Sequence, residues 1–506
     1  MSAAAEHHHI VIIGSGFSGL GAAIRFKQEG IHDFVVLERA EDVGGTWRDN
    51  TYPGCACDVP SHLYSFSFAP NPKWSRTFSK QPEIWEYLRR CSREHGVEQH
   101  VRYRHEVTAA NWDEQAQRWL LDTTAGNFSA DIVIAAAGPL SDPKLPDIDG
   151  IESFQGKIFH SARWDHEHAL DGERVAVIGT GASSIQLVPR IQPQVQQLDL
   201  YQRTPPWVTR HRDRPISRRE QLLYRLFPPA QLAMRAAIYW ARELFVIGFM
   251  HPREGTLGER MALGHLHAQV KDPELREQLT PRYRLGCKRV LISNEYYPAL
   301  TQPNVEVVTD GISAIKPHAI VTSAGEERPV DTIILGTGFH VTDQPIAQWV
   351  RGRDGRSLAD TWKSSPQAYL GASIAGFPNL FMLVGPNTGL GHNSIVFMIE
   401  SQLNHLLECL RFMKRSATDV VEVRETTQKL YNQRVQRELE GSVWNSGGCA
   451  SWYIDDTGKN TTIWPGFTWP FRKRTRDFAP DDYHLRTRTS TDGSPPSTPA
   501  QAALVS

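Results

Sequence analysis

Residues 9–20 have the sequence HIVIIGSGFSGL, in which an apolar, β-branched run leads directly into glycines spaced as GxGxxG. Each glycine has a mechanical reason: Gly14 permits a tight turn, Gly16 lets a pyrophosphate approach the backbone, and Gly19 lets the next helix pack on the strand. A helical pattern and a second apolar strand follow, and this strand ends at Glu38. An acid about twenty residues beyond such a turn is placed to bind ribose hydroxyls. The stretch therefore predicts a βαβ unit that binds a dinucleotide.

The same order of features returns once further along the chain. Residues 174–184 have the sequence RVAVIGTGASS, in which Ser184 replaces the third glycine with another small residue. The strand that follows the helix ends at Gln202 and carries no acid, and Arg203 and Thr204 come next. A carboxylate at this point would repel a 2′-phosphate, whereas an arginine pairs with it. The second unit therefore favours NADPH over NADH, the alternative being that Arg203 lies on a solvated loop.

Length and composition limit the class of protein. A chain of 506 residues is too long for one hydrophobic core, so about two or three domains are expected. A hydrophobic fraction of 40% and a net charge of −1 indicate a globular protein without the broad positive field that binds nucleic acid. We expect no signal peptide, no integral membrane segment and a cytoplasmic location.

The most apolar long stretch, residues 231–250, is interrupted by Arg235, Arg242 and Glu243. We interpret it as a well-packed amphipathic helix. A surface that rests on a membrane is the less favoured alternative.

The six cysteines indicate neither a disulfide framework nor a metal site. Cys55 and Cys57 stand two apart, unlike the redox pair of a disulfide reductase, and we expect reduced thiols throughout. Two nucleotide units in one chain suit an enzyme in which a nicotinamide reduces a permanently held flavin. Reductases of this kind pass the electrons to a cysteine pair, whereas monooxygenases pass them to O₂ and need no redox side chain. The missing cysteine pair therefore favours a monooxygenase.

The order of the predicted elements indicates an α/β fold with two Rossmann-like dinucleotide-binding domains and a mostly helical insertion. Antiparallel strands are expected at 107–112 and 119–122, and buried strands that run into glycine at 131–138 and 331–338 are expected to close the two units. We assign residues 1–150 and 331–480 to the first domain, 151–212 and 283–330 to the second, 213–282 to the helical insertion, and 481–506 to a disordered tail.

Two longer motifs are more specific than the glycine turns. Residues 154–165, FQGKIFHSARWD, match the fingerprint FxGxxxHxxxW(P/D), and residues 44–58 match GGxWxxxxYPGxxxD. In these motifs the chain resembles the type I Baeyer–Villiger monooxygenases, and the resemblance extends from about Ile10 to Asp477. Flavin-containing monooxygenases resemble this family broadly but typically end the fingerprint with Tyr or Phe. The matching fingerprint residues are Phe154, Gly156, His160, Trp164 and Asp165.

The resemblance implies an enzyme that holds FAD in the first domain and NADPH in the second. It implies oxidation of a small-molecule ketone by O₂ to an ester or lactone through a peroxide on flavin carbon 4a, with sulfide oxidation as a side activity. The implied FAD contacts are Gly14, Gly16, Phe17, Gly19, Glu38, Gly45, Thr46, Trp47, Asp58, Tyr64, Val107 and Asn387. The implied NADP contacts are Thr180, Gly181, Ser183, Ser184, Gln186, Arg203, Thr204 and Lys288.

For catalysis the resemblance points to Arg289, in the segment GCKR at residues 286–289. A guanidinium is always charged and presents a planar fork of donors to an oxyanion, and Asp58 is expected to orient it. The alternatives are a surface position for Arg289 and a turn cap for Asp58. We interpret His160 as a structural residue that bonds the backbone between the domains. By resemblance, the helix at 393–411 points its N-terminus at the flavin.

Two other functions stay open. A flavin-containing N- or S-oxygenase would attack amines or sulfides, and an NADPH-consuming oxidase or a nucleotide-binding flavoprotein would form no oxygenated product. Trp164 and Asp165 favour ketone oxidation over the first, and the intact glycine turns argue against a protein that only binds nucleotides. The natural ketone and the oligomeric state are not predictable from the sequence.

Overall fold

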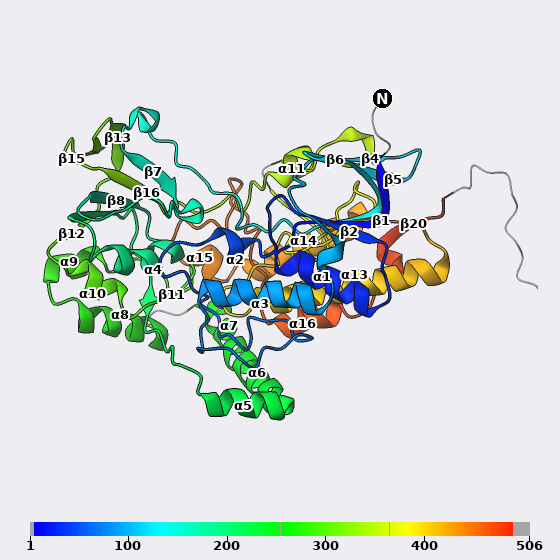
Figure 1. Cartoon of the computed structure of the whole chain (residues 1–506), viewed down its shortest axis with the longest axis horizontal. Helices are drawn as coiled ribbons and strands as arrows, with labels where there is room; N and C mark the ends of the chain where they lie inside the picture. The colour runs from blue at the N-terminus through cyan, green and yellow to red at the C-terminus, as the bar shows by residue number, and fades with distance from the viewer. Residues whose placement is uncertain (1–4, 253–254, 364, 489–506) are drawn as a thin grey trace, which may run out of the picture.

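The computed structural model describes residues 5–252, 255–363 and 365–488. Two sheets, each with its own helices, lie side by side in Figure 1, and a group of helices projects from the lower side. The predicted α/β class is confirmed, because each sheet contains a parallel strand–helix–strand unit that starts at one of the glycine turns.

The first sheet is built around the strand Glu6–Ile13, whose apolar half is almost fully buried. This strand pairs in parallel with its two neighbours, while the predicted antiparallel strands form a meander beside it. In sheet order the strands are β17 (Val350–Arg351), β4 (Val107–Asp113), β5 (Arg118–Thr123), β6 (Gly126–Ala135), β1 (Glu6–Ile13), β2 (Phe34–Leu37) and β3 (Val101–Arg102), with β18 (Leu380–Met382) beside β6.

The second sheet is parallel throughout and corrects one domain boundary. We assigned residues 331–480 to the first domain, but the strand Thr332–Leu335 lies inside the second sheet, where it closes the second unit as β6 closes the first. The second domain therefore extends past residue 330. In sheet order the strands are β12 (Val305–Val308), β9 (Gln197–Tyr201), β8 (Arg174–Ile178), β16 (Thr332–Leu335) and β7 (Lys157–His160).

Helices cover one face of the first sheet. α1 (Phe17–Gln28) packs against α3 (Gln81–Glu94) and against α13 (Ile395–Ser416), and α13 also contacts α16 (Thr468–Arg474). Residues of β1 alternate between two cores: Ile10 and Ile12 lie beneath these helices, whereas Val11 and Ile13 lie on the opposite face. Burial on both faces explains why the strand is apolar at successive positions.

The two domains contain further helices and strands. The helices are α2 (Thr46–Asp49), α4 (Ala182–Ile191), α10 (Tyr296–Leu300), α11 (Ile346–Trp349), α12 (Leu358–Trp362), α14 (Glu425–Leu439) and α15 (Val443–Ser446). The strands are β10 (Val208–Thr209), β11 (Leu291–Ile292), β13 (Ile312–Lys316), β14 (Ala319–Thr322), β15 (Glu327–Pro329), β19 (Val420–Val423) and β20 (Tyr483–Arg486). Single-turn 3-10 helices are η1 (Glu98–His100), η2 (Ile151–Ser153), η3 (Ser161–Arg163), η4 (Arg353–Gly355) and η5 (Pro480–Asp482).

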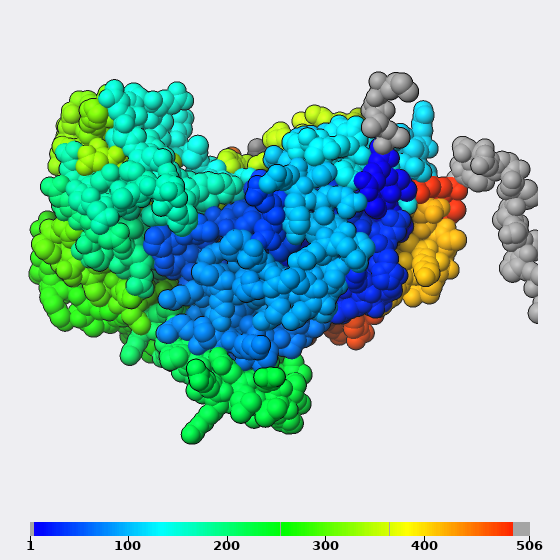
Figure 2. Space-filling model, viewed as in Figure 1, coloured from blue at the N-terminus to red at the C-terminus, as the bar shows by residue number. Residues whose placement is uncertain are grey.

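The predicted helical insertion is present as α5 (Arg218–Leu226), α6 (Pro228–Glu243), α7 (Phe245–Met250), α8 (Leu257–Gln269) and α9 (Pro273–Gln278). Its projecting part, at the bottom of Figures 1 and 2, contains α5 and α6. Our expectation of a well-packed helix at 231–250 is wrong: Gln231 and Glu243 are buried, whereas Leu232 and Trp240 are 49% and 56% exposed. Within the described ranges no helix is both long and apolar enough to span a bilayer.

The predicted disordered tail, 481–506, begins too early. Tyr483–Arg486 form β20, which pairs antiparallel with β19, and Arg488 binds Asp131 at 2.7 Å. The polar composition of this segment did not indicate a strand, because the strand forms by pairing with β19, which lies far earlier in the chain. Residues 489–506 lie outside the described residues.

The expectation of reduced thiols throughout is also wrong. Cys287 and Cys449, 162 residues apart in sequence, form a disulfide. Their loops meet only in the folded chain, so spacing gave no sign of the pair. The cytoplasmic location stays a prediction, and cysteine usage no longer supports it. The free cysteines, all buried, are Cys55, Cys57, Cys91 and Cys409.

We expect the unfolded, unreduced protein to react with Ellman's reagent at the four free cysteines only, and at all six after reduction. Cys449→Ser should raise the unreduced count by one, because Cys287 loses its partner. Cys409→Ser is the control and should lower the count by one. Six reactive thiols in the unfolded, unreduced wild-type protein would contradict the pairing.

Candidate active site

The two glycine turns are built alike. Gly14 has φ +98° and Gly179 has φ +109°, conformations that a residue with a side chain rarely adopts. A Cβ on Gly14 would lie 2.8 Å from the carbonyl oxygen of Ala136, and one on Gly179 would lie 2.5 Å from that of Gly336. Each turn is thus pressed against the end of its closing strand, β6 or β16. Both turns lie at the carboxyl ends of parallel strands, where open α/β sheets bind ligands.

The third position of the motif differs between the turns. A Cβ on Gly19 would lie 1.9 Å from the carbonyl oxygen of Gly14, so α1 has no room for a side chain there. In α4 this place is taken by Ser184, which is completely buried. The serine fits because its neighbour is Gly336, directly after β16, where a Cβ would lie 2.3 Å from the serine Oγ. A glycine just past the closing strand therefore compensates for the serine in the helix.

The helices that follow the turns leave their first amides open. The N-caps are Gly16 in α1 and Gly181 in α4, and both helices, which lie wholly in the described residues, lack a side-chain cap and a first-turn acid. Ser183 stands in the first turn of α4. By contrast, α5, α8 and α12 each begin with a complete capping box. Open amides and the positive end of a helix dipole fit the pyrophosphate of a dinucleotide at both turns.

The paired glycines of the second motif lie on the first turn. A Cβ on Gly45 would come 3.1 Å from the Cα of Gly16, and Gly45 itself has φ +51°. Gly45 is also the N-cap of α2, where Thr46 Oγ1 donates to the carbonyl of Leu140 at 3.5 Å. A cofactor on the first turn would therefore contact backbone of both motifs.

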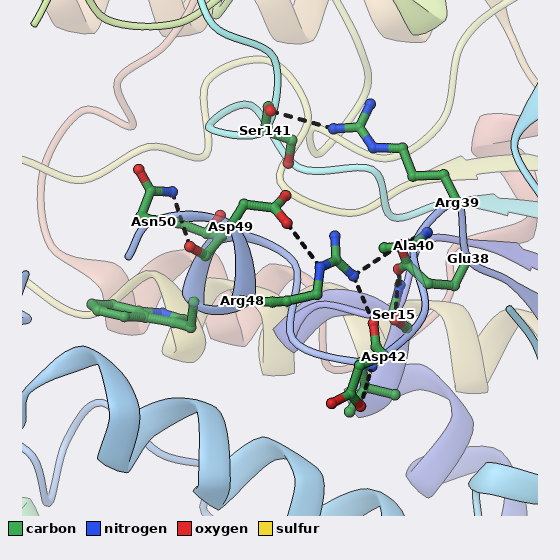
Figure 3. A network of polar contacts seen from close by, with 12 residues as sticks. Ser15, Glu38, Arg39, Ala40, Asp42, Arg48, Asp49, Asn50 and Ser141 are labelled. Carbon is green, nitrogen blue, oxygen red and sulfur yellow. Dashed lines mark hydrogen bonds and ion pairs between the residues drawn. The ribbon is translucent and has the colours of Figure 1, made fainter. Parts of the chain in front are cut away.

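Glu38 lies at the first turn with donors on both carboxylate oxygens (Figure 3). It is 3% exposed, and its Oε2 accepts from the amide and the hydroxyl of Ser15 at 3.0 and 2.6 Å. Its Oε1 accepts from the amide of Ala40 and pairs with Arg48, both at 2.9 Å. Glu38, which is predicted to bind the ribose, therefore already stabilises the turn. A ribose hydroxyl would have to share the Glu38 carboxylate oxygens with these donors.

The aromatic residues predicted around the flavin meet one another. Trp47 Nε1 donates to the hydroxyl of Tyr64 at 3.1 Å, and the ring of Phe17 meets that of Tyr64 edge-on at 5.1 Å. Val107 is buried at the start of β4, and the amide of nearby His105 donates to the carbonyl of Glu38 at 2.9 Å. The predicted contacts from α1, α2 and β4 therefore surround the same glycine turn.

Asn387 holds the chain together with its side chain. It is 2% exposed and has φ +54°, and its Nδ2 donates to the carbonyls of Asn460 and Ile463 at 2.8 and 3.0 Å. These bonds fix the loop at 460–463 against the glycine turn that precedes α13. Both hydrogens of the Asn387 Nδ2 are therefore engaged within the protein.

Two cations from distant segments lie near each other beside the second turn. Arg203 follows β9, and the Lys288 ammonium lies 5.3 Å from the ring of Tyr283. Burial lowers the pKa of Lys288, and the charge of Arg203 lowers it further. In the part of the chain that the structure describes, neither cation pairs with a carboxylate. Thr180 Oγ1 donates to the carbonyl of Thr204 at 3.1 Å and holds this loop. Two unpaired cations fit a 2′-phosphate.

Gln186 has a different partner from the predicted NADP phosphates. Its Oε1 accepts from the hydroxyl of Tyr52 at 2.9 Å, and its Nε2 donates to the carbonyl of Ala56 at 3.0 Å. A Cβ on Gly54, which has φ +86°, would lie 2.5 Å from the Gln186 carbonyl oxygen. The Tyr-Pro-Gly part of the second motif therefore packs against α4 and joins the two domains.

The fingerprint begins as a packing motif at the edge of the second sheet. A Cβ on Gly156 would lie 2.2 Å from the carbonyl oxygen of Asp331 and 2.6 Å from the ring of Phe154. Only glycine fits there, because β7 runs directly beside β16 at this point.

The remaining residues of the fingerprint make contacts within their own segment of the chain. His160 is 4% exposed, and its Nδ1 accepts from the amide of Ala162 at 3.1 Å. Burial lowers the pKa of His160 to about 4, so the ring is neutral at pH 7. Trp164 is half-buried, and Asp165 pairs with Lys157 at 2.5 Å. These contacts suit a structural role for His160, because at neutral pH the ring is not the imidazolium that a general acid requires.

Arg289 and Asp58 form a bidentate ion pair. The arginine Nε and Nη2 lie 2.5 Å from Oδ2 and Oδ1, and the two side chains are 33% and 22% exposed. Burial raises the pKa of Asp58, but the guanidiniums of Arg289 and Arg242 lower it, and the pKa lies below its ordinary value. The arginine Nη1 makes only a long contact, 3.5 Å to the carbonyl of Leu390. One donor edge of the fork is therefore left for an oxyanion.

Sequence reasoning missed two arginines. Arg242, on α6, donates to the carbonyl of His392 at 2.9 Å, and its charge acts on both members of the Asp58–Arg289 pair. Its signal was present, because it interrupts the most apolar stretch of the chain. Arg48 stands at a variable position of the second motif, and nothing there indicated that it pairs with the acid of the first turn.

Over most of its length the chain is similar to known proteins. A family model described as pyridine nucleotide-disulphide oxidoreductase matches residues 11–226. A Baeyer–Villiger monooxygenase of Streptomyces coelicolor is 54% identical over 476 residues, which cover 93% of this chain and 91% of that protein. Another, from Pseudomonas aeruginosa, is 52% identical over 488 residues, which cover 96% and 93%. The crystal structure of OTEMO in complex with FAD and NADP matches with a TM-score of 0.85 at 27% identity, over 96% and 100% of the two chains. The chain therefore belongs to the Baeyer–Villiger monooxygenase family.

Proposed function

We propose that this protein binds FAD in the first domain and NADPH in the second, and uses O₂ to convert a ketone into an ester or lactone. Relatives that are 54% and 52% identical over the aligned residues are named Baeyer–Villiger monooxygenases, and OTEMO was crystallised in complex with FAD and NADP. The observation that carries the proposal is the bidentate pair of Arg289 with Asp58. The pair holds a cation in place between two segments. One is the motif at residues 44–58, which packs on both glycine turns, and the other is the segment at residues 286–289, which carries Lys288.

FAD held at the first glycine turn by the backbone of Gly14, Gly16 and Gly19 would, when reduced by NADPH, supply the oxygen atom from O₂ that is added to the ketone. Arg289 directs its free Nη1 edge at the negative charge of the reacting oxygen, since Asp58 occupies the other edge. Arg242 adds a second positive charge at the same place. Because the pKa of Asp58 is lowered and an arginine stays protonated, the pair does not titrate at neutral pH and is lost only in acid.

Ketone oxidation is tested by supplying the FAD-loaded protein with NADPH, isotopically labelled O₂ and a panel that includes cyclohexanone and phenylacetone. We expect an ester or lactone that is one oxygen atom heavier than the ketone and carries the label, measured by mass spectrometry. A product without label, or one H₂O₂ released for each NADPH with every ketone, would remove the proposal. Sulfoxidation of a thioether while every ketone stays untouched would indicate the heteroatom oxygenase instead.

Replacing the guanidinium group of Arg289 is the direct test of its role. In Arg289→Lys the charge remains but the planar bidentate geometry is lost, so ester formation should fall by roughly a hundredfold. Flavin content and reduction by NADPH should persist, with H₂O₂ released in place of product. Arg174→Lys is the matched control, because Arg174 binds Asp331 bidentately with 39% and 38% exposure, away from the site. Equal losses in both variants would assign Arg289 a purely structural role.

Selection of the 2′-phosphate is tested with the double variant Arg203→Gln/Lys288→Gln. Each charge-assisted bond contributes about 1.5–3 kcal/mol and the variant removes two, so the KM for NADPH should rise by roughly a hundredfold or more. The KM for NADH, which lacks the 2′-phosphate, should stay within about twofold and is the internal control. A parallel rise in both constants would show that these cations do not distinguish the coenzymes.

A further inference from the structure

Helix α6 turns a polar side toward the protein body. Gln231 Nε2 donates to the carbonyl of Asn71 at 2.7 Å. Arg235 Nη1 donates to the carbonyls of His62 and Ser65 at 2.8 and 2.9 Å. These polar groups are satisfied by the body, so this half of the helix is anchored through its polar side.

The C-terminal half of α6 is anchored in the same way. Arg242 donates to the carbonyl of His392 at 2.9 Å. Glu243 is completely buried, and its Oε1 accepts from Asn393 Nδ2 and Thr468 Oγ1 at 2.5 and 2.7 Å. Withdrawing these charges from their partners is unfavourable, so the helix cannot simply rotate its polar side outward.

The outward side of α6 is consequently apolar. Exposed positions on this side carry no charged residue along the whole helix, all of which is described. Charged residues normally occupy the solvent side of a surface helix, so α6 is inverted relative to an ordinary one. The outward residues, with the C-cap, are Leu232, Ala233, Met234, Ala236, Ala237, Trp240, Ala241 and Leu244.

The exposed apolar surface continues onto α5 and α7. We define the apolar ridge as the large apolar side chains of α5–α7 with 38–73% exposure. Figures 1 and 2 show that α5 and the adjoining part of α6 stand clear of the body. An exposed apolar surface of this kind marks a place of contact. The ridge consists of Leu222, Leu223, Leu226, Phe227, Leu232, Met234, Trp240, Leu244, Phe245 and Ile247.

On α5 and α6, which the structure describes completely, the ridge has cations but no free acid. Arg218, Arg219 and Arg225 of α5 are exposed and have no ion pair with any residue in the described ranges. The acid of α5, Glu220, is held by Arg214 at 2.8 and 3.0 Å, and the acid of α6 is buried. The complement of this surface is apolar and negatively charged.

We propose that the apolar ridge docks on the surface of a lipid bilayer that contains anionic phospholipids, with α5–α7 lying in the headgroup region. This site goes beyond the proposed function and does not depend on it. Apolar side chains enter the acyl boundary while the arginines of α5 meet lipid phosphates, as in helices that lie on a membrane. A second copy of the chain fits less well, because a symmetric contact brings the same unpaired arginines together on a convex surface.

The test is co-sedimentation of the full-length, FAD-loaded protein with vesicles of phosphatidylcholine alone or with about 30% phosphatidylglycerol. We expect the wild-type protein to pellet with the anionic vesicles, more weakly at high salt, and not with the neutral ones. Leu226→Gln/Leu244→Gln should reduce binding roughly tenfold. The matched control Leu145→Gln/Leu430→Gln, at positions 64% and 65% exposed outside the ridge, should bind like wild type.

The charge contribution is tested with Arg218→Gln/Arg219→Gln/Arg225→Gln, which should also bind roughly tenfold more weakly. Its control removes the same charge elsewhere, in Arg356→Gln/Arg415→Gln/Arg437→Gln. Unchanged NADPH oxidation by the Leu226/Leu244 variant excludes misfolding, and vesicle binding itself requires no turnover.

Three outcomes overturn the proposal. They are failure of the wild-type protein to pellet, equal pelleting with both kinds of vesicle, and, by light scattering, a dimer that the Leu226→Gln/Leu244→Gln change dissociates.

Discussion

The ion pair between Asp58 and Arg289 is the contact on which the site depends. It joins a loop of the first domain to a segment of the second that lies 231 residues further along the chain. A bidentate pair fixes the plane and direction of the guanidinium, which a single hydrogen bond does not. Separating the partners would leave a charge uncompensated, and such separation is unfavourable in a partly buried site. Stability of the domain junction and orientation of the Arg289 guanidinium, the cation that we propose acts in catalysis, therefore come from the same contact.

The glycine turns and α4 provide the support that this pair requires. Gly14 and Gly179 are each confined by the end of a closing strand, so neither turn can shift without moving its sheet. Gln186, from α4, binds the backbone of Ala56, two residues before the acid of the pair. The loop that carries the acid is thus held by the first turn through Gly45 and by the second domain through Gln186. Rigid support on both sides is what orients a charged group for catalysis.

Features that depend on near neighbours in sequence were predictable, and features that depend on distant contacts were not. The glycine turns, the β4–β5 pair and the helical insertion follow from local patterns, and Asp58 and Arg289 were identified because motifs carry them. The membership of β16 in the second sheet, the partner of Gln186 and the disulfide of Cys287 each require two segments that meet only after folding. Ser184 shows the limit most simply: its fit in α4 depends on Gly336, a glycine more than 150 residues further along the chain that directly follows β16.

Helix α6 shows why a hydrophobic pattern alone does not decide which side of a helix is buried. Its polar and apolar residues separate cleanly, and such a pattern ordinarily predicts that the apolar side packs inward. Here the body offers carbonyls to Arg235 and hydrogen-bond donors to Glu243, so the polar side gains more from burial than the apolar side would. One of these anchors, Arg242, also interacts electrostatically with the Asp58–Arg289 pair, so the orientation of the helix is linked to the candidate active site. The unfavourable exposure of the apolar side remains, and only an apolar surface outside the protein removes it.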